Sequence, residues 1–443
     1  MRILEYTLGL PPFRRGGLPR YSTDLSEELA KNNKVYLMYP GQINPYSKKI
    51  ELIKKNTKYS FETIEMKNPL PVSLGLGVRD EEYYMEKRNI LVLKNFVEKI
   101  RPDVVHLHTL MGMPKEFLEY LKTKKIKIVY TTHDFYGLCP KMLSKDPKNE
   151  LRNSECSYDC MLCKIGPSYR KIVIMQSHIY EKLKESRLIQ KIRSKNKAKI
   201  TRENNSIILD KDRAELRYKL RKYYLKMFNL IDEFHFNSTV SKEYVSRFLP
   251  NANGKVISIT HKGLQDNRGL KAKISDKKIK FGYIGPYDEK KGFFLLCKLI
   301  LKLRENYKNF EVHFYGDITD NSIFRKSWVI NHRLLPNDCM YKAYKNIDIL
   351  IMPSLWHETF GFSVLEALSY GDTCLVSKRV GAKDIVPNEC IFDDKDELME
   401  IMKSILANPT KLLEKYQKEV LKEKLPINFQ SHVKLIYDTY YIK

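Results

Sequence analysis

The segment Ile349–Gly371 reads ILIMPSLWHETFGFSVLEALSYG and changes character twice along its length. An apolar run of strand length, Ile347–Met352, ends at a Pro-Ser pair, and a loop with an acidic residue follows it. Beyond Gly361, apolar residues recur with helical spacing over Ser363–Tyr370. We therefore predict a strand, a loop and a helix in this order, which is the unit from which parallel α/β sheets are built.

Two carboxylates of this segment lie eight residues apart, Glu358 in the loop and Glu366 in the helix. A carboxylate has two acceptor oxygens and a sugar diol has two donors, so each glutamate can hold one sugar. The helix start, at Thr359, Phe360 and Gly361, offers unpaired amides and a partial positive charge to a diphosphate. The spacing predicts a site for a nucleotide-diphosphate sugar. The alternative is a helix with two solvated glutamates.

In the setting HETFGFSVLEALSYG, Glu358 and Glu366 resemble the E-x7-E signature of the retaining glycosyltransferases of family 4. The likeness extends to PSLWHE before them and GDTCLVSKRVGAKDIV after them, and it covers both halves of the chain apart from an insertion. It implies the two-domain GT-B fold, in which Glu366 binds the ribose and Glu358 lies beside the donor sugar. It also implies a hexosyltransferase in which the nucleotide diphosphate departs from one face of the donor sugar and the acceptor attacks the same face. The likeness further implies that catalysis requires no metal cofactor.

The segment Phe281–Gly292, FGYIGPYDEKKG, resembles the phosphate-binding loop G-R-x-x-x-x-K-G of that family. Lys291 would neutralise the donor diphosphate and assist its departure. The alternative is a solvated Lys-Lys-Gly turn. Pro286 stands where the family has an arginine. The missing charge could come from Lys290, or from Arg14, Arg15 or Arg20 across the cleft.

The first half of the chain contributes further candidates. Gly16 and Gly17 lie in PPFRRGGLPRYSTDLSEELA, before an amphipathic helix, and resemble the family's glycine-rich loop; a tight turn would use the same residues. His133 follows a strand in VYTTHDFYGLCP and resembles the family's HD motif, whose histidine hydrogen-bonds the donor sugar or its phosphate. His106 and His108, in DVVHLH, also end a strand near the cleft, with His108 a candidate for the acceptor side.

Short apolar runs alternate with helical patterns along most of the 443 residues, which are too many for one ordinary core. The alternation predicts an α/β protein with two doubly wound parallel-sheet, Rossmann-like domains facing across a cleft. We place an acceptor-side domain at 1–262, with a cysteine-containing, basic helical insertion at about 137–230. A donor-binding domain follows at 280–424, and a C-terminal helix in 425–443 should pack back on the first domain.

Four of the eight cysteines lie in the insertion. Their spacing can close a tetrahedral structural zinc site, and free loop thiols are the alternative. These residues are Cys139, Cys156, Cys160 and Cys163. The other four are scattered in mostly apolar surroundings, which is typical of inert core thiols.

The formal net charge of +26 favours anionic partners, namely phosphorylated small molecules, an anionic membrane surface or nucleic acid. The basic stretch Lys191–Lys226 contains interleaved tyrosines and leucines and could lie on an anionic membrane; a solvated helical face is the alternative. No helix-turn-helix, zinc-finger or aromatic RNA-binding signature is present, so we expect no nucleic-acid partner.

The first residues contain no apolar segment of signal-peptide type, and the chain has no run of 18 apolar residues. We therefore expect a cytoplasmic protein, or one that is peripheral on the inner face of a membrane.

Together these features predict a retaining glycosyltransferase that moves a sugar from a nucleotide-diphosphate sugar to a hydroxyl acceptor. The acceptor would be a glycan or a lipid-linked sugar, in glycan, polysaccharide or glycolipid synthesis. A sugar phosphorylase or hydrolytic relative is an enzymatic alternative. A catalytically silent sugar-nucleotide-binding subunit and a nucleic-acid-binding protein are alternatives from other classes.

Overall fold

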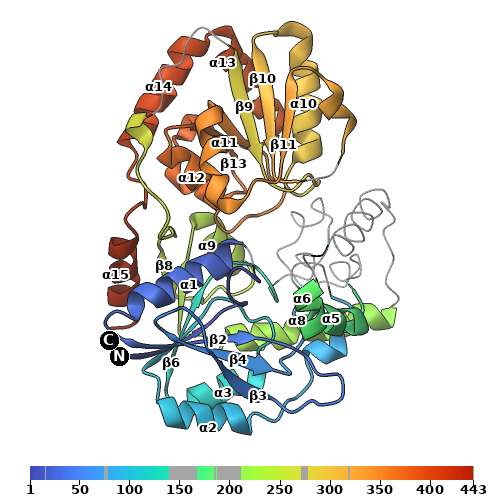
Figure 1. Ribbon diagram of the computed structural model, residues 1–443, viewed down its shortest axis with the longest axis vertical. Helices are drawn as coiled ribbons and strands as arrows, with labels where there is room; N and C mark the ends of the chain where they lie inside the picture. Colours follow the sequence, from blue (N-terminus) through green and yellow to red (C-terminus); the bar gives the residue numbers. More distant parts are fainter. Residues whose placement is uncertain are drawn as a thin grey trace.

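Two parallel-dominated sheets with helices on their faces make up the computed structural model, one above the other in Figure 1. The structure describes residues 1–14, 16–73, 78–138, 167–183, 186, 211–270, 278–317 and 320–442. The predicted α/β class with two doubly wound sheets is confirmed.

The first sheet has eight strands in the order β3-β4-β2-β1-β5-β6-β7-β8. Its strands are β1 (Arg2–Tyr6), β2 (Lys34–Pro40), β3 (Glu51–Lys55), β4 (Glu62–Lys67), β5 (Val104–Leu107), β6 (Lys127–Thr131), β7 (Glu233–Phe236) and β8 (Gly254–Val256). Helices α1 (Gly17–Leu29), α2 (Leu91–Ile100), α3 (Lys115–Thr123) and α9 (Thr239–Ser246) connect them.

The second sheet has six strands in the order β11-β10-β9-β12-β13-β14. They are β9 (Ile279–Ile284), β10 (Phe310–Tyr315), β11 (Val329–Arg333), β12 (Ile349–Met352), β13 (Thr373–Ser377) and β14 (Ile391–Phe392). Its helices are α10 (Phe293–Asn306), α11 (Tyr341–Asn346), α12 (Phe362–Ser369), α13 (Lys395–Ala407) and α14 (Pro409–Lys422).

The expectation of purely parallel sheets is wrong at one edge, because β3 runs antiparallel to β4. Only residues 56–61 connect the two strands. A parallel pair needs a crossover of a dozen or more residues, so this connection permits only a hairpin. The other strand pairs of both sheets are parallel.

The strand order reverses between β1 and β5 in the first sheet and between β9 and β12 in the second. In doubly wound sheets, ligands bind outside the carboxyl ends of the strands at these switch points. The loops after β1, β5, β9 and β12 carry Gly16, His108, Lys291 and Glu358 respectively. The topology therefore brings most of the predicted site residues to two facing sheet edges.

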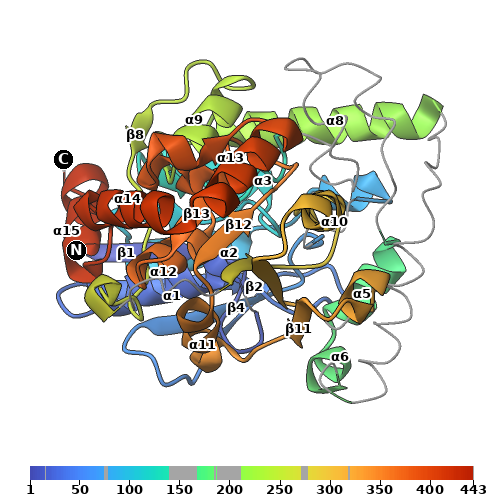
Figure 2. The same cartoon turned by 90° about the horizontal axis from the view of Figure 1, so that it is seen from above.

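The helices between β6 and β7 that the structure describes are α5 (Tyr169–Met175), α6 (His178–Leu183) and α8 (Lys211–Phe228). Figures 1 and 2 place them on the side of the molecule away from α15 (Phe429–Tyr440). The apolar face of α8 is part of the first domain's core, since Leu220, Tyr224 and Met227 are buried. Its exposed face carries lysines at 219, 222 and 226.

Helix α15 follows the second domain in the chain but lies beside α1 of the first (Figure 1). The hydroxyl of Tyr440 donates to the carbonyl of Phe234 in β7 at 3.1 Å. One cluster of buried apolar side chains includes Leu25 of α1, Leu365 of α12 and Ile436 of α15. A shared core therefore connects the two domains and the C-terminal helix.

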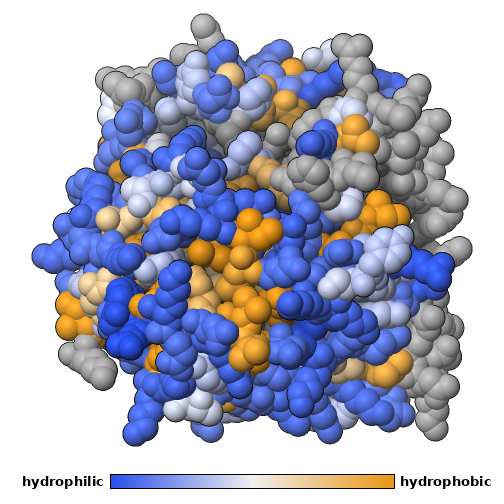
Figure 3. All heavy atoms as spheres, turned by 60° about the horizontal axis from the view of Figure 1, so that its bottom comes forward, coloured by the Kyte–Doolittle hydropathy of each residue, from blue (hydrophilic) through white to orange (hydrophobic). Residues whose placement is uncertain are grey.

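The face drawn in Figure 3 is mostly hydrophilic, with apolar side chains gathered near its centre. Within the described ranges, every helix is too short or too polar to cross a bilayer.

Candidate functional site

The second glutamate of the motif, Glu366, lies in α12 at the contact between the domains. Its Oε1 accepts hydrogen bonds from Arg20 Nη1 and His261 Nε2, each at 2.9 Å. Its Oε2 accepts one from the hydroxyl of Tyr344 at 2.5 Å. Arg20 comes from α1 and His261 follows β8, so the first domain contributes two of these donors.

Glu366 is ionised in this setting. Burial raises the pKa of its carboxyl, but the hydrogen bonds from His261 and Tyr344 and the charges of His261 and Arg20 outweigh burial. The net effect is a pKa below the ordinary value of 4.5. A carboxylate has about four lone-pair sites. Three are occupied here, so a ribose that used two acceptor sites would displace a protein donor.

The first glutamate, Glu358, forms an ion pair with Lys291, whose Nζ lies 2.7 Å from Glu358 Oε2. Its other oxygen accepts a hydrogen bond from the hydroxyl of Ser354. The backbone of Glu358 is held as well, because its N–H donates to the carbonyl of Arg379 at 2.9 Å. The structure thus joins the predicted phosphate loop and the predicted acidic motif in one cluster.

Glycine is required next to Lys291 and, three residues after Glu358, at the start of α12. Gly292 follows Lys291 with φ +73°, and a Cβ there would lie 1.9 Å from the carbonyl oxygen of Pro353. Gly361 caps α12 with φ +113°. Both positions have the left-handed backbone that L side chains rarely adopt. They allow the Lys291 loop and the start of α12 to pack closely against neighbouring segments.

The two domains touch directly at the motif loop. The hydroxyl of Thr359 donates to the carbonyl of His133 at 3.0 Å, and the hydroxyl of Ser238 donates to the carbonyl of Thr359 at 2.5 Å. Gly17, the first residue of α1, lies so near Phe362 that a Cβ would be 2.9 Å from its ring. Gly17, His133 and the start of α12 are therefore neighbours.

His133 is half-buried, and it is neutral. Burial lowers the pKa of its imidazole well below the ordinary 6.5, and the neighbouring imidazoles of His108, His235 and His106 lower it further. Its Nε2 lies 3.1 Å from Nδ1 of His108. A neutral imidazole has one donor and one acceptor nitrogen, so its tautomer decides what it can recognise.

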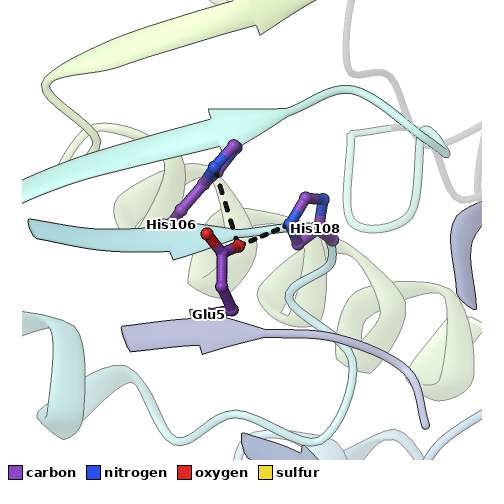
Figure 4. A group of neighbouring side chains, drawn as sticks. All are labelled: Glu5, His106 and His108. Atoms are coloured by element: carbon purple, nitrogen blue, oxygen red, sulfur yellow. Dashed lines mark hydrogen bonds and ion pairs between the residues drawn. The ribbon is translucent and has the colours of Figure 1, made fainter. Parts of the chain in front are cut away.

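Behind His133, Glu5 of β1 and His106 and His108 of β5 point toward one another (Figure 4). Two histidines and a glutamate are a possible zinc-ligand set. However, both nitrogens of each imidazole and both oxygens of Glu5 already have hydrogen-bond partners. Glu5 Oε2 and His108 Nε2 are only 2.7 Å apart, whereas two ligands of one tetrahedral zinc ion lie about 3.3 Å apart. The cluster is a hydrogen-bond network.

Stability should fall early in acid because of four buried imidazoles. Burial is the main cause that lowers their pKa values from 6.5 to about 3; these are His106, His108, His235 and His432. Between pH 6.5 and 3 the unfolded chain binds protons that the folded chain does not. The free energy of unfolding therefore falls as the pH is lowered through this window, by up to about 1.4 kcal/mol per pH unit for each histidine.

Urea unfolding at pH 7.5, 6.5 and 5.5 measures this effect. For the four histidines together we expect a loss of about 1.4 kcal/mol between the first two values and of about 4 kcal/mol more at pH 5.5. Ordinary carboxylates are still mostly ionised at that pH, so they contribute little to the loss. Equal stability at pH 7.5 and 5.5 would contradict the neutral, buried state of these histidines.

The cations considered as replacements for the missing arginine have different positions. Arg20 reaches Glu366, not Glu358. Lys290 lies over the ring of Trp356, 3.9 Å from its centre. Arg14 lines a pocket of the first domain, and Arg15 lies outside the described residues.

Sequence reasoning missed three contributors to this region, namely His261, Tyr344 and Ser354. Tyr344 lies within α11, His261 follows β8 and Ser354 follows β12, and only proximity in the fold reveals their contacts with the two glutamates. The four cysteines at 139, 156, 160 and 163 lie outside the described residues, so the proposed structural zinc site stays a prediction.

Two family models match this chain. The model described as "Glycosyl transferases group 1" matches residues 268–423, and the model described as "Glycosyltransferase Family 4" matches residues 15–157. The first range contains Lys291, Glu358 and Glu366, and the second contains Gly16, Gly17 and His133.

Solved structures with this fold include a sucrose-phosphate synthase from Thermosynechococcus elongatus, with 13% identity and a TM-score of 0.56, covering 99% of this chain and 98% of that one. An α,α-trehalose-phosphate synthase from Burkholderia xenovorans, in complex with glucose-6-phosphate, has 9% identity and a TM-score of 0.57, covering 99% of each chain. Anabaena HepE, in complex with UDP and glucose, has 13% identity and a TM-score of 0.53, covering 99% of each chain. This likeness confirms the GT-B architecture.

Among curated proteins, an uncharacterised 42.6 kDa protein in the cps region of Klebsiella pneumoniae is 22% identical over 313 residues. The match covers 70% of this chain and 66% of that protein, slightly less than two thirds of its length.

Proposed function

Because this chain belongs to the group 1 glycosyl transferases, we propose that it moves a sugar from a nucleotide-diphosphate sugar to a hydroxyl acceptor with retention of configuration. One observation carries the proposal. The two carboxylates of the motif lie at opposite ends of one loop and helix start, and Lys291 lies 2.7 Å from the first of them. A diphosphate between two sugars needs hydroxyl acceptors at both ends and a cation between them.

In this proposal Glu366 accepts hydrogen bonds from the ribose and Glu358 from the donor sugar. The diphosphate lies between Lys291 and the N–H groups at the start of α12, with Thr359, Phe360 and Gly361 around it. Support comes from the ionised state of Glu366, since a charged acceptor binds hydroxyls more strongly than a neutral one. The donor would replace Arg20 or another protein donor on Glu366.

The proposed reaction breaks the bond between the anomeric carbon and the diphosphate oxygen. The acceptor oxygen bonds to that carbon on the same face, and its proton passes to the departing phosphate. Lys291 and the start of α12 stabilise the negative charge that develops there. In this proposal His133 contacts the donor, and support comes from its carbonyl, which accepts a hydrogen bond from Thr359 in the motif loop. This scheme needs no catalytic metal.

We place the acceptor in the first domain. A pocket of about 280 Å³ lies at the ends of β1, β2 and β3, and polar side chains are interspersed with apolar ones in its lining. Hydroxyl-rich ligands suit such a lining, which includes Arg14, Gln42, Lys55, Asn56, Thr57 and Glu65. A hexose transferred to a glycan or lipid-linked sugar would serve polysaccharide or glycolipid synthesis.

A panel of sugar nucleotides with different bases and sugars tests the proposal. Binding is measured by calorimetry, and release of nucleoside diphosphate is measured with glycan and lipid-linked acceptor extracts. Binding with acceptor-dependent release is the expected result. The central claim fails if no sugar nucleotide binds.

A second candidate function is a silent sugar-nucleotide-binding subunit, and Pro286 in place of the family's arginine favours it. It predicts binding without release for every acceptor extract. A phosphorylase would instead form a sugar phosphate when inorganic phosphate is added as the acceptor.

A further inference from the structure

We propose that a chain of hydrogen bonds across the first sheet fixes the tautomer of His133, so that its Nδ1 accepts a hydrogen bond from a sugar hydroxyl. The positioning residues are Glu5, His108 and Tyr441, which would not touch the substrate. The identity of the ligand rests on the proposed function. The tautomer itself does not, because it follows from counting protons along the chain.

The count begins at the carbonyl oxygen of Ile257, just after β8, because a carbonyl can only accept. His235 Nε2 lies 2.7 Å from that oxygen, so it carries the proton and donates. Burial lowers the pKa of His235, which is therefore neutral, and its Nδ1 is a bare acceptor. The hydroxyl of Thr131 in β6 lies 2.9 Å away and donates its single hydrogen to this nitrogen.

The next link joins Thr131 to His106 in β5. Since the hydrogen of Thr131 is already used, its oxygen must accept from His106 Nε2 at 2.7 Å. A neutral His106 then has a bare Nδ1, which accepts from the hydroxyl of Tyr441 at 2.5 Å. The same hydroxyl oxygen lies 3.0 Å from Glu5 Oε1. Tyr441 donates to Oε1 when His106 carries the extra proton. When His106 is neutral, Oε1 carries that proton, and in both arrangements Oε2 is bare.

The remaining oxygen, Glu5 Oε2, is bare and accepts from His108 Nε2 at 2.7 Å. A neutral His108 therefore has a bare Nδ1, which accepts from His133 Nε2 at 3.1 Å. In a neutral His133, the proton on Nε2 leaves a lone pair on Nδ1. Within the part of the chain that the structure describes, that nitrogen has no hydrogen-bond partner, so it is available to a ligand.

Two further observations support this direction. Burial raises the pKa of Glu5 and lowers those of His106 and His108, so a neutral network is favoured over separated charges. If the proton moved from Glu5 to His106 through Tyr441, Oε2 would still be bare, and His108 and His133 would keep the same tautomers. Reversing the chain would require the Ile257 carbonyl to donate, which is impossible.

The register of the first sheet brings the hydrogen-bonded side chains of this chain next to one another. His235 and Thr131 are register partners in β7 and β6, and His106 and Glu5 are register partners in β5 and β1. Their side chains leave the same face of the sheet at neighbouring positions. Tyr441 closes the gap from the C-terminal segment.

The consequence is a choice between two ligands. An imidazole with a bare Nδ1 can accept from a sugar hydroxyl, but it cannot donate to a phosphate oxygen. His133 would then distinguish donor sugars by a hydroxyl at one ring position, and it would not stabilise the negative charge of the diphosphate.

Nitrogen-15 NMR of the histidine-labelled, full-length protein tests the proposal without substrate, since protonated and bare ring nitrogens have distinct shifts. In the parent protein we expect His133, assigned by comparison with His133→Gln, to have a bare Nδ1. Tyr441→Phe removes the link between Glu5 and His106, so both tautomers of His133 should appear. Tyr437→Phe, in α15 one turn before Tyr441, is the matched control and should leave the spectrum of His133 unchanged.

Substitution of Glu5 gives a sharper test. Glu5→Gln can donate from its amide toward Tyr441 and accept from His108 through its carbonyl, so it should preserve the tautomer, whereas Glu5→Leu should not. In turnover assays, Tyr441→Phe should lower kcat about tenfold with a smaller change in the donor KM, as expected for one misplaced hydrogen bond. A protonated Nδ1 in the parent protein, or one tautomer retained in Tyr441→Phe, overturns the proposal. If the parent protein has the expected tautomer but shows no turnover, only the proposed function is refuted.

Discussion

Glu366→Ala is expected to lower kcat/KM for the sugar-nucleotide donor roughly 100-fold or more, through the loss of charge-assisted hydrogen bonds to the ribose. The carboxylate is ionised and receives three hydrogen bonds from protein groups. Its substitution removes the acceptor that the donor would share with these groups. Steady-state release of nucleoside diphosphate and calorimetric binding of the donor measure the effect.

A structural role for Glu366 must be separated from donor binding, because this carboxylate also holds Arg20 of the first domain. Arg20→Ala removes one of the two first-domain donors to Glu366 but leaves the carboxylate, so its effect on donor binding should be much smaller. Glu305→Ala, on the exposed side of α10, controls for loss of a surface charge. If Arg20→Ala and Glu366→Ala weaken donor binding equally, Glu366 is a domain contact and the donor assignment is wrong.

Lys291→Ala is expected to lower kcat roughly 100- to 1000-fold, with a smaller change in donor affinity. A preorganised cation stabilises the leaving diphosphate most in the transition state, where its charge is greatest. The substitution also leaves Glu358 without its partner at 2.7 Å, which adds an unpaired negative charge near the diphosphate. Single-turnover kinetics with saturating donor separate the chemical step from donor binding.

The neighbouring lysine provides the matched control. Lys290 has the same charge but lies over the ring of Trp356, so Lys290→Ala should change kcat only slightly. Lys291→Arg keeps the charge in a different shape and should retain part of the activity. Equal losses in Lys290→Ala and Lys291→Ala would indicate a diffuse basic surface instead of a specific phosphate contact.

Much of the fold could be predicted because the spacing of apolar residues along the chain indicates its strands and helices. The apolar run Ile347–Met352 contains the strand Ile349–Met352 as expected, and the helical pattern Ser363–Tyr370 corresponds to the helix Phe362–Ser369. The hairpin β3–β4 escaped prediction because polar and apolar residues are mixed in both strands, ELIKK and ETIEMK, so that no long apolar run marks either of them.

The candidate site was predictable where residue type and spacing carry the chemistry. Glu358, Glu366 and Lys291 belong to motifs, and the topology of parallel sheets brings such loops to one edge. His261, Tyr344 and Ser354 could not be found this way. Histidine, tyrosine and serine are common in ordinary cores and loops, and only their distances from the two glutamates give them a role.

The sequence by itself determined the family resemblance and the order of most strands and helices, because both depend on residues close together in the chain. The tertiary structure decided the states of the polar groups. Glu366 is ionised because Arg20, His261 and Tyr344 surround it, from segments up to 346 residues away. The proposed tautomer of His133 depends on Ile257, Tyr441 and Glu5 in the same way. Burial and long-range hydrogen bonds set protonation, and neither exists until distant segments of the chain have met.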